Sequence, residues 1–126
     1  MALQLTIPDP QDVDVTLDST YARIVAFNAD FTVGNEHAAV VLDIYRSEAA
    51  RNGGKPSVAR VQVLMPTETQ EEHTDEDGNV TVPHKPSFSD EMAANIDAYN
   101  ALKTALYNYV KTYDQTVKDA NPVDLV

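Results

Sequence analysis

The chain has 126 residues, a formal net charge of −11 at pH 7 and no cysteine. Its length and its 43% hydrophobic content predict one domain with a modest core. The missing cysteines exclude disulfides, thiolate–zinc sites and cysteine nucleophiles, and the nine scattered Lys and Arg residues argue against binding to nucleic acid, which requires clustered basic side chains.

Residues 1–19 are rich in Pro and Asp and are too polar and too interrupted to form a core. The chain does not begin with a basic segment and a long apolar run, so no signal peptide is expected. No stretch approaches the roughly 20 apolar residues that span a bilayer. We therefore predict an extended N-terminal arm over residues 1–19 and a protein made in the cytoplasm without a membrane partner.

Residues 20–66 show the period of two that is typical of β-strands. In "YARIVAFNADFTV" one face, interrupted only by Arg23, holds Tyr21, Val25, Phe27, Ala29, Phe31 and Val33. Gly34 and Asn35 then predict a tight turn, because both residues tolerate positive φ. Strands over residues 20–33, 37–46 and 57–66 would form an antiparallel meander with one apolar face.

Six carboxylates crowd into residues 68–77 and raise the question of a metal site. Counted from Asp75, however, glycine is the fourth residue and not the sixth that a calcium loop requires, and Pro86 stands where the last acidic ligand belongs. A closed zinc site needs four N or S ligands, and the chain has only three histidines. We therefore predict no metal and no cofactor.

An Asp77–Gly78 turn of two residues predicts instead an acidic hairpin over residues 67–84. In that register Glu71 opposes His84 and His73 opposes Val82. A cross-strand Glu–His pair stabilises a hairpin by about 0.2–1 kcal/mol. The acidic run then joins the sheet to the following helix.

Residues 89–118 read as one long helix, with Ser87 or Ser89 as N-cap and with Asp90 and Glu91 in the first turn. An apolar stripe at steps of three and four holds Met92, Ile96, Tyr99, Leu102, Leu106, Tyr109, Val110, Tyr113 and Val117. We expect this stripe to pack on the apolar face of the sheet. A helix of about 30 residues extends roughly 45 Å, whereas a strand of ten residues spans roughly 33 Å, so the helix either breaks or offers part of its stripe to a partner.

Together these elements predict an α+β fold: an arm over residues 1–19 and a single domain over residues 20–126, made of a meander (20–66), an acidic hairpin (67–84) and a helix (89–118). We predict no enzymatic activity. All three histidines lie in or beside turns, so no Ser/His/Asp arrangement is indicated. The segment "NGGKPS" departs from a phosphate-binding loop, because Pro56 separates Lys55 from Ser57.

The order of the segments resembles a group of proteins. A lead-in "LTIPDPQDVDVTL" is followed by "TYARIVAFNADF", by "AAVVLDIYRSEAARNGGKP" and by a terminal helix. This order resembles the small accessory structural proteins of tailed-bacteriophage virions, which are encoded among tail and baseplate genes. The likeness is strongest over Val40–Pro56, where Tyr45 leads into Ser-Glu-Ala-Ala-Arg and Gly-Lys-Pro. The acidic run over residues 67–77 is not typical of this group.

The resemblance implies a structural subunit that is made in the host bacterial cytoplasm and resides in the virion. It implies several copies or a homo-oligomer that binds larger tail, baseplate or neck proteins. Two alternatives remain: an acidic phage-encoded inhibitor that mimics nucleic acid and binds a host protein, and a capsid decoration protein. The predicted protein-binding residues lie on the arm and on the outer part of the helix: Leu3, Leu5, Ile7, Val13, Val15, Tyr107, Tyr113 and Val117. Of these, Tyr107 lies off the apolar stripe and is the best candidate for an exposed contact.

Overall fold

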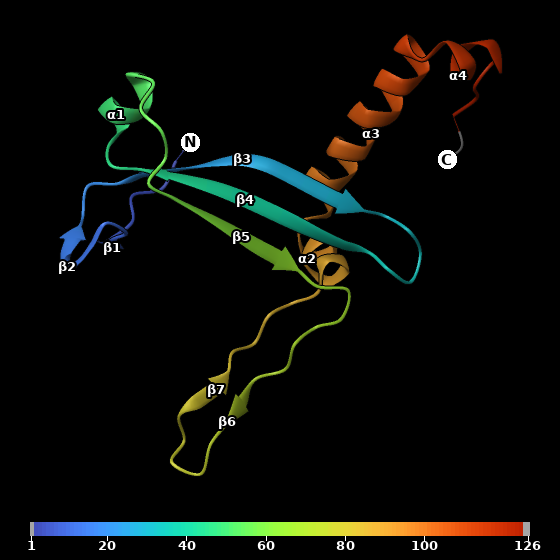
Figure 1. The fold of residues 1–126 in the computed structure, drawn as a ribbon. Coiled ribbons are helices and arrows are strands. Elements are labelled where there is room, and N and C mark those ends of the chain that lie inside the picture. The colour runs from blue at the N-terminus through green and yellow to red at the C-terminus, as the bar shows by residue number, and fades with distance from the viewer. Residues whose placement is uncertain (1, 125–126) are drawn as a thin grey trace. The chain divides into compact units, whose positions relative to one another are not determined.

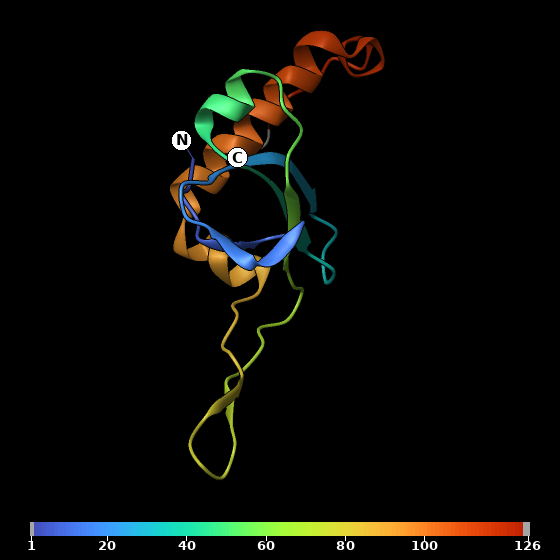
Figure 2. The same ribbon diagram turned by 60° about the vertical axis from the view of Figure 1, so that its left-hand side comes forward.

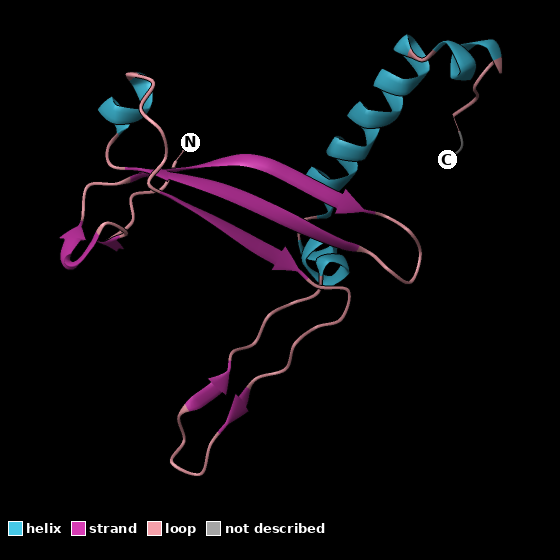
Figure 3. Cartoon of the chain, in the orientation of Figure 1, coloured by secondary structure: helices cyan, strands magenta, loops and turns pink. Residues whose placement is uncertain are grey.

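The computed structural model describes residues 2–124, and the chain divides into two compact units, Met1–Phe88 and Ser89–Val126. The predicted α+β class is confirmed, because antiparallel strands precede a helical C-terminal part (Figures 1 and 3). The division differs from the expectation of a single domain over residues 20–126. Its boundary falls directly after the last residue of the sheet unit's core, Phe88.

The first unit contains all the strands. Their order is β1 (Ile7–Asp9), β2 (Asp12–Leu17), β3 (Tyr21–Asp30), β4 (His37–Tyr45), the short helix α1 (Glu48–Asn52), β5 (Ala59–Met65), β6 (His73–Thr74) and β7 (Val80–Val82). β3, β4 and β5 form one antiparallel sheet in the order β3-β4-β5, as the predicted meander requires. β1 pairs with β2 and β6 with β7 in two separate two-stranded sheets.

The N-terminal segment is not the extended arm that its composition predicts. β1 and β2 form a hairpin, in which Ile7 lies opposite Leu17. Pro10 follows Asp9 in the turn, and the Asp9 carboxylate accepts a hydrogen bond from the backbone N–H of Gln11, a local arrangement that favours chain reversal. Of the Pro and Asp residues that suggested an open arm, Pro10 lies in the turn, Asp9 accepts a hydrogen bond within it, and Pro8, Asp12 and Asp14 lie in the two strands.

Two sets of hydrogen bonds hold this hairpin to the three-stranded sheet. Leu3 and Ala22 exchange backbone hydrogen bonds of 2.9 and 2.8 Å. The backbone N–H of Leu5 donates to Thr20 Oγ1, and the Thr20 hydroxyl donates back to the Leu5 carbonyl. Thr20 is buried, so both of its polar contacts are shielded from water.

The core of the sheet unit is small. Ala22, Ala38, Ile44 and Phe88 are the buried apolar residues of the described chain. The Phe88 ring lies 6.0 Å from the ring of Phe31, and its backbone N–H donates to the carbonyl of Pro66. Phe88, which follows the acidic hairpin in the sequence, therefore completes the core of the sheet unit.

The acidic hairpin of β6 and β7 extends beyond the end of β5 (Figures 1 and 2). His73 lies opposite Val82, as predicted, and a bridge between Gln70 and Lys85 continues the pairing toward the sheet. The register shifts between His73 and Thr74, so the pairing near the turn differs from the prediction.

The turn itself is longer than the predicted Asp77–Gly78 pair. The backbone N–H of Gly78 donates to the Asp75 carbonyl, and that of Asp75 donates to the Asn79 carbonyl, which encloses residues 76–78. Gly78 has φ +82°, the left-handed conformation that ends a hairpin loop of this length. The Asp75 carboxylate accepts hydrogen bonds from the N–H groups of Asp77 and Asn79 and so caps the turn.

The C-terminal part consists of three helices, α2 (Phe88–Ala94), α3 (Ile96–Tyr113) and α4 (Gln115–Asp119). The predicted long C-terminal helix is confirmed as α3, but the helical structure over residues 89–118 is interrupted at Asn95 and Asp114 and is not one continuous helix as predicted. At Asn95 the side-chain amide donates to the carbonyl of Glu91, which competes with the helical hydrogen bonds. Asp114 has an extended backbone and caps α4, because its carboxylate accepts from the N–H of Val117.

The predicted packing of the long helix on the apolar face of the sheet concerns the relation between the two units and stays a prediction. α3 itself contains no buried residue.

Candidate functional site

A β-bulge in β3 changes which side chains share a face of the three-stranded sheet. Ile24 lies opposite Leu42 and Ala26 lies opposite Val41, so Val25 is an extra residue without a partner in β4. An extra residue exchanges the two faces for the rest of the strand. The strict alternation predicted from the sequence, which placed Tyr21 with Phe27, is therefore wrong before the bulge.

The bulge creates one face that is entirely apolar. Residues in register across neighbouring strands lie on the same side of a sheet. From the pairing of β3, β4 and β5, the apolar sheet face consists of Ala22, Ile24, Phe27, Ala29, Ala38, Val40, Leu42, Ile44, Ala59, Val61, Val63 and Met65. Arg23, which interrupts the predicted face, lies on the opposite side.

The middle of the apolar sheet face is exposed. Ala22, Ala38 and Ile44, toward the ends of the strands, are buried. Between them, the exposed fractions are 60% for Ile24, 45% for Phe27, 43% for Val61 and 41% for Val63. A contiguous exposed apolar surface of this kind typically marks an interaction site, whereas single exposed apolar residues do not.

The opposite face of the sheet mixes polar and apolar side chains and carries an ion pair. The Asp43 carboxylate is bound by Arg60, with Arg60 Nε 2.6 Å from Oδ1 and Nη2 3.0 Å from Oδ2. The hydrogen bond from Arg60 lowers the pKa of Asp43 below its usual value and outweighs the opposing effect of desolvation. This ion pair is a structural contact within the opposite face, and it joins β4 to β5.

The predicted contact residues of the N-terminal segment divide into two groups. Leu3, Leu5 and Ile7 take part in the backbone contacts that hold the hairpin, although the Leu3 side chain remains exposed. Val13 and Val15 are two residues apart on β2 and are both exposed. Their alternation places these two side chains on the same side of the strand.

The predicted contact residues of the helices are also separated by the structure. Tyr107 and Val117 line an open pocket of about 600 Å³ formed by α3, α4 and the following segment. An ion pair between Lys111 and Asp124 lies at this pocket. Tyr113 does not line it; its ring lies 4.9 Å from that of Tyr109, and both rings are exposed.

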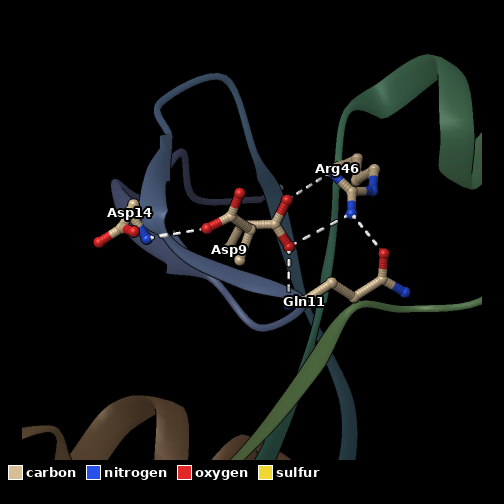
Figure 4. Close-up of polar contacts among 5 residues, drawn as sticks. Asp9, Gln11, Asp14 and Arg46 are labelled. Carbon is tan, nitrogen blue, oxygen red and sulfur yellow. Dashed lines mark hydrogen bonds and ion pairs between the residues drawn. The ribbon is translucent and has the colours of Figure 1, made fainter.

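Sequence reasoning did not find a polar cluster between β1 and the end of β4 (Figure 4). Arg46 donates to both carboxylate oxygens of the buried Asp9, at 3.2 and 3.3 Å, and reaches Gln11 Oε1 at 3.5 Å. The pKa of Asp9 is lowered, first by the hydrogen bond from the Gln11 backbone and then by Arg46. Lys55 lines the adjacent pocket of about 510 Å³. Because Asp9 and Arg46 are far apart in the sequence, no local pattern could have indicated this contact.

The acidic hairpin presents charge and not a built site. Glu71, Glu72, Glu76 and Asp77 are exposed, whereas Asp75 is engaged in the turn. Over residues 2–124 no cluster of three or more His, Cys, Asp or Glu side chains could hold a metal ion.

None of the helices described is long and apolar enough to cross a membrane. Comparison with protein families, curated proteins and solved structures found no match to the chain.

Proposed function

We propose that the chain is a non-enzymatic structural subunit of a tailed-phage virion and that it binds a larger tail, baseplate or neck protein through the apolar sheet face. The exposure of Ile24, Phe27, Val61 and Val63 in the middle of this face carries the proposal. The segment order described above, strongest over Val40–Pro56, supports the virion as the place of assembly.

The strength of such a contact can be bounded. Burying one large apolar side chain is worth about 1.5–3 kcal/mol, so the half-exposed quartet contributes on the order of 3–6 kcal/mol. Association costs an estimated 4–15 kcal/mol in lost freedom of motion. The apolar sheet face by itself therefore supports only weak binding, and stable attachment requires further contacts or several linked copies.

Each of the two units offers further contacts. Val13 and Val15 on β2, and Tyr107 and Tyr113 on α3, are exposed and belong to the predicted contact residues. Tyrosine is common in protein interfaces because its ring is apolar and its hydroxyl is polar. In this proposal these residues reinforce the apolar sheet face, and the protein has no nucleic-acid or membrane partner.

Mass spectrometry of purified phage particles tests the proposal. We expect the protein at a fixed ratio to a tail, baseplate or neck protein; a fixed ratio to a capsid protein would favour a decoration protein instead. Its absence from purified particles would contradict both assignments.

The role of the apolar sheet face is tested by particle incorporation of an Ile24→Lys, Phe27→Lys variant. The matched control is Asn28→Lys, which places a lysine at an exposed position on the other face of the same strand. The double variant should fold but fail to incorporate, and the control should incorporate normally. Equal incorporation of both variants would exclude this face as the contact.

A second candidate function rests on the acidic hairpin. Exposed carboxylates along a projecting hairpin could take the place of nucleic-acid phosphates in an inhibitor of a host protein. Binding of a basic host protein should then weaken steeply with salt. Replacing Glu71, Glu72, Glu76 and Asp77 with their amides should abolish that binding, whereas salt-independent binding would contradict this function.

A further inference from the structure

The direction of the backbone groups in the three-stranded sheet follows from one contact. Because Ala22 exchanges both backbone hydrogen bonds with Leu3, its N–H and C=O point away from β4. In a strand these directions alternate, so the backbone N–H and C=O of Arg23 point toward Asp43 in β4. The backbone groups of Asp43 therefore point toward β3, and those of its neighbour Ile44 point toward β5. The hydrogen bond of 2.7 Å from the Val58 N–H to the Ile44 carbonyl agrees with this direction.

The same alternation determines the outer side of β5. The even-numbered residues of β4 form backbone hydrogen bonds with the β5 residues opposite them, for example Leu42 with Val61. The backbone groups of Arg60, Gln62 and Leu64 therefore point outward. Within residues 2–124, β5 is the last strand of its sheet, and no backbone hydrogen bond to these three residues is formed from the outer side.

The two edges of the sheet differ in their protection. Proteins prevent edge-to-edge pairing with bulges, prolines, lysines or covering segments. The β3 edge has the bulge at Val25 and the bridge from Leu3. β5 contains neither proline nor lysine, its register with β4 is regular, and its one charged side chain, Arg60, is bound to Asp43. The β5 edge is therefore open to another strand.

We propose that β5 pairs antiparallel with β5 of a second copy of the chain, about a twofold axis that passes through Gln62. Arg60 then lies opposite Leu64 of the partner subunit, and Gln62 lies opposite its own counterpart. This register satisfies all the outward N–H and C=O groups of Arg60, Gln62 and Leu64, which a shift in either direction does not. A twofold interface of this kind closes and leaves no further edge of the same type.

The pairing also joins the apolar faces of the two copies. Val61 would lie beside Val63 of the partner subunit as a non-hydrogen-bonded pair, in which side chains approach most closely. The result is a six-stranded sheet with a continuous apolar surface. This surface is twice as wide as the apolar sheet face of one chain. The pairing of the two copies does not depend on which protein the apolar sheet face binds.

Charge favours the antiparallel arrangement. The connection before β5 carries Arg51, in α1, and Lys55, and the segment after β5 carries Glu68, Glu71 and Glu72. Antiparallel pairing about Gln62 directs the basic connection of each copy toward the acidic segment of the other. Opposite charges placed at both ends of an interface fix its register and orientation.

The mass of the purified chain in solution, measured by sedimentation velocity, tests the pairing. The wild type should sediment with twice the 13.8 kDa mass of the chain. Gln62→Lys places two lysines directly opposite each other at the axis and should raise the dimer dissociation constant roughly tenfold. Asn28→Lys, on the same face but on β3, should leave it unchanged. A monomeric wild type, or equal effects of the two variants, would overturn the proposal.

A single introduced cysteine tests the register, because the natural chain has none. Gln62→Cys should form an intermolecular disulfide in a glutathione redox buffer, since opposed hydrogen-bonded residues have Cα atoms about 5.5 Å apart. Asn28→Cys should remain reduced. Equal cross-linking of both variants would contradict the axis at Gln62. These experiments use the chain alone, so a monomer would overturn the pairing and leave the virion assignment to be decided by particle composition.

Discussion

Asp43 and Arg60 lie opposite each other on β4 and β5 and form a two-pronged ion pair, with distances of 2.6 and 3.0 Å. Asp43 is buried, whereas the Arg60 side chain lies mostly in water. The arginine of the edge strand therefore covers a carboxylate that the centre of the sheet would otherwise leave buried without a partner. This contact joins the edge strand β5 to its neighbour β4.

Removing the arginine should destabilise the sheet more than removing the pair. Arg60→Gln leaves the buried Asp43 carboxylate without its cation, and a buried charge without a partner strongly lowers the free energy of unfolding. We expect a lower urea midpoint for this variant and a partial recovery in the Asp43→Asn, Arg60→Gln double variant. Arg51→Gln, at α1, is the control and should leave the midpoint unchanged. A midpoint for Arg60→Gln equal to that of the control would argue against a stabilising pair.

The same pair predicts a direction for the pH dependence of stability. The folded-state pKa of Asp43 lies below its ordinary value of 3.8, so the unfolded chain binds the proton more readily than the folded chain. The contribution of the pair is fully present above pH 3.8 and is lost as the pH falls below this value toward the lowered pKa. Urea midpoints measured across this range should fall less in Asp43→Asn than in the wild type. Parallel curves for the two proteins would contradict the assignment.

Phe88 should contribute more to stability than any exposed phenylalanine. It is 1% exposed and contacts Phe31, so Phe88→Ala removes a complete buried ring and should lower the free energy of unfolding by about 3–5 kcal/mol. Phe27→Ala, on the exposed part of the apolar sheet face, should cost about 1 kcal/mol or less. Chemical denaturation of the two variants compares them directly. Similar losses would mean that Phe88 is not the core residue of the sheet unit.

The carboxylates of the acidic hairpin should differ in role: that of Asp75 stabilises the turn, and the others are free to bind a partner. Asp75→Ala removes the acceptor of two backbone N–H groups and should increase hydrogen exchange at Asp77 and Asn79. Amide substitutions at Glu71, Glu72 and Glu76 should leave exchange and melting temperature unchanged. If the hairpin meets a basic neighbour in an assembly, these substitutions should weaken that assembly only. Equal exchange in Asp75→Ala and the wild type would contradict the capping role.

Local patterns predicted the elements that depend on near neighbours in the sequence. The three strands of the meander appear where the period of two is strongest, and the positions of the helical region and of the acidic hairpin are also confirmed. A break in the long helix was one of two expectations, but its positions at Asn95 and Asp114 were not predicted. Both residues interrupt the helix through side-chain bonds to the backbone, and a hydrophobic stripe continues across them without a change of period.

The sequence by itself determined the class of the fold, because strand alternation, helix periodicity and turn residues act over a few positions. Only the tertiary structure decided which side chains share a face, since the bulge at Val25 depends on how β3 pairs with β4 and not on the residues of β3 alone. The same holds for Asp9 and Arg46, which meet only when the N-terminal hairpin folds back on the sheet. The apolar sheet face and the open β5 edge result from pairing between segments that are distant in the sequence. Such pairing cannot be predicted from the local pattern of one segment.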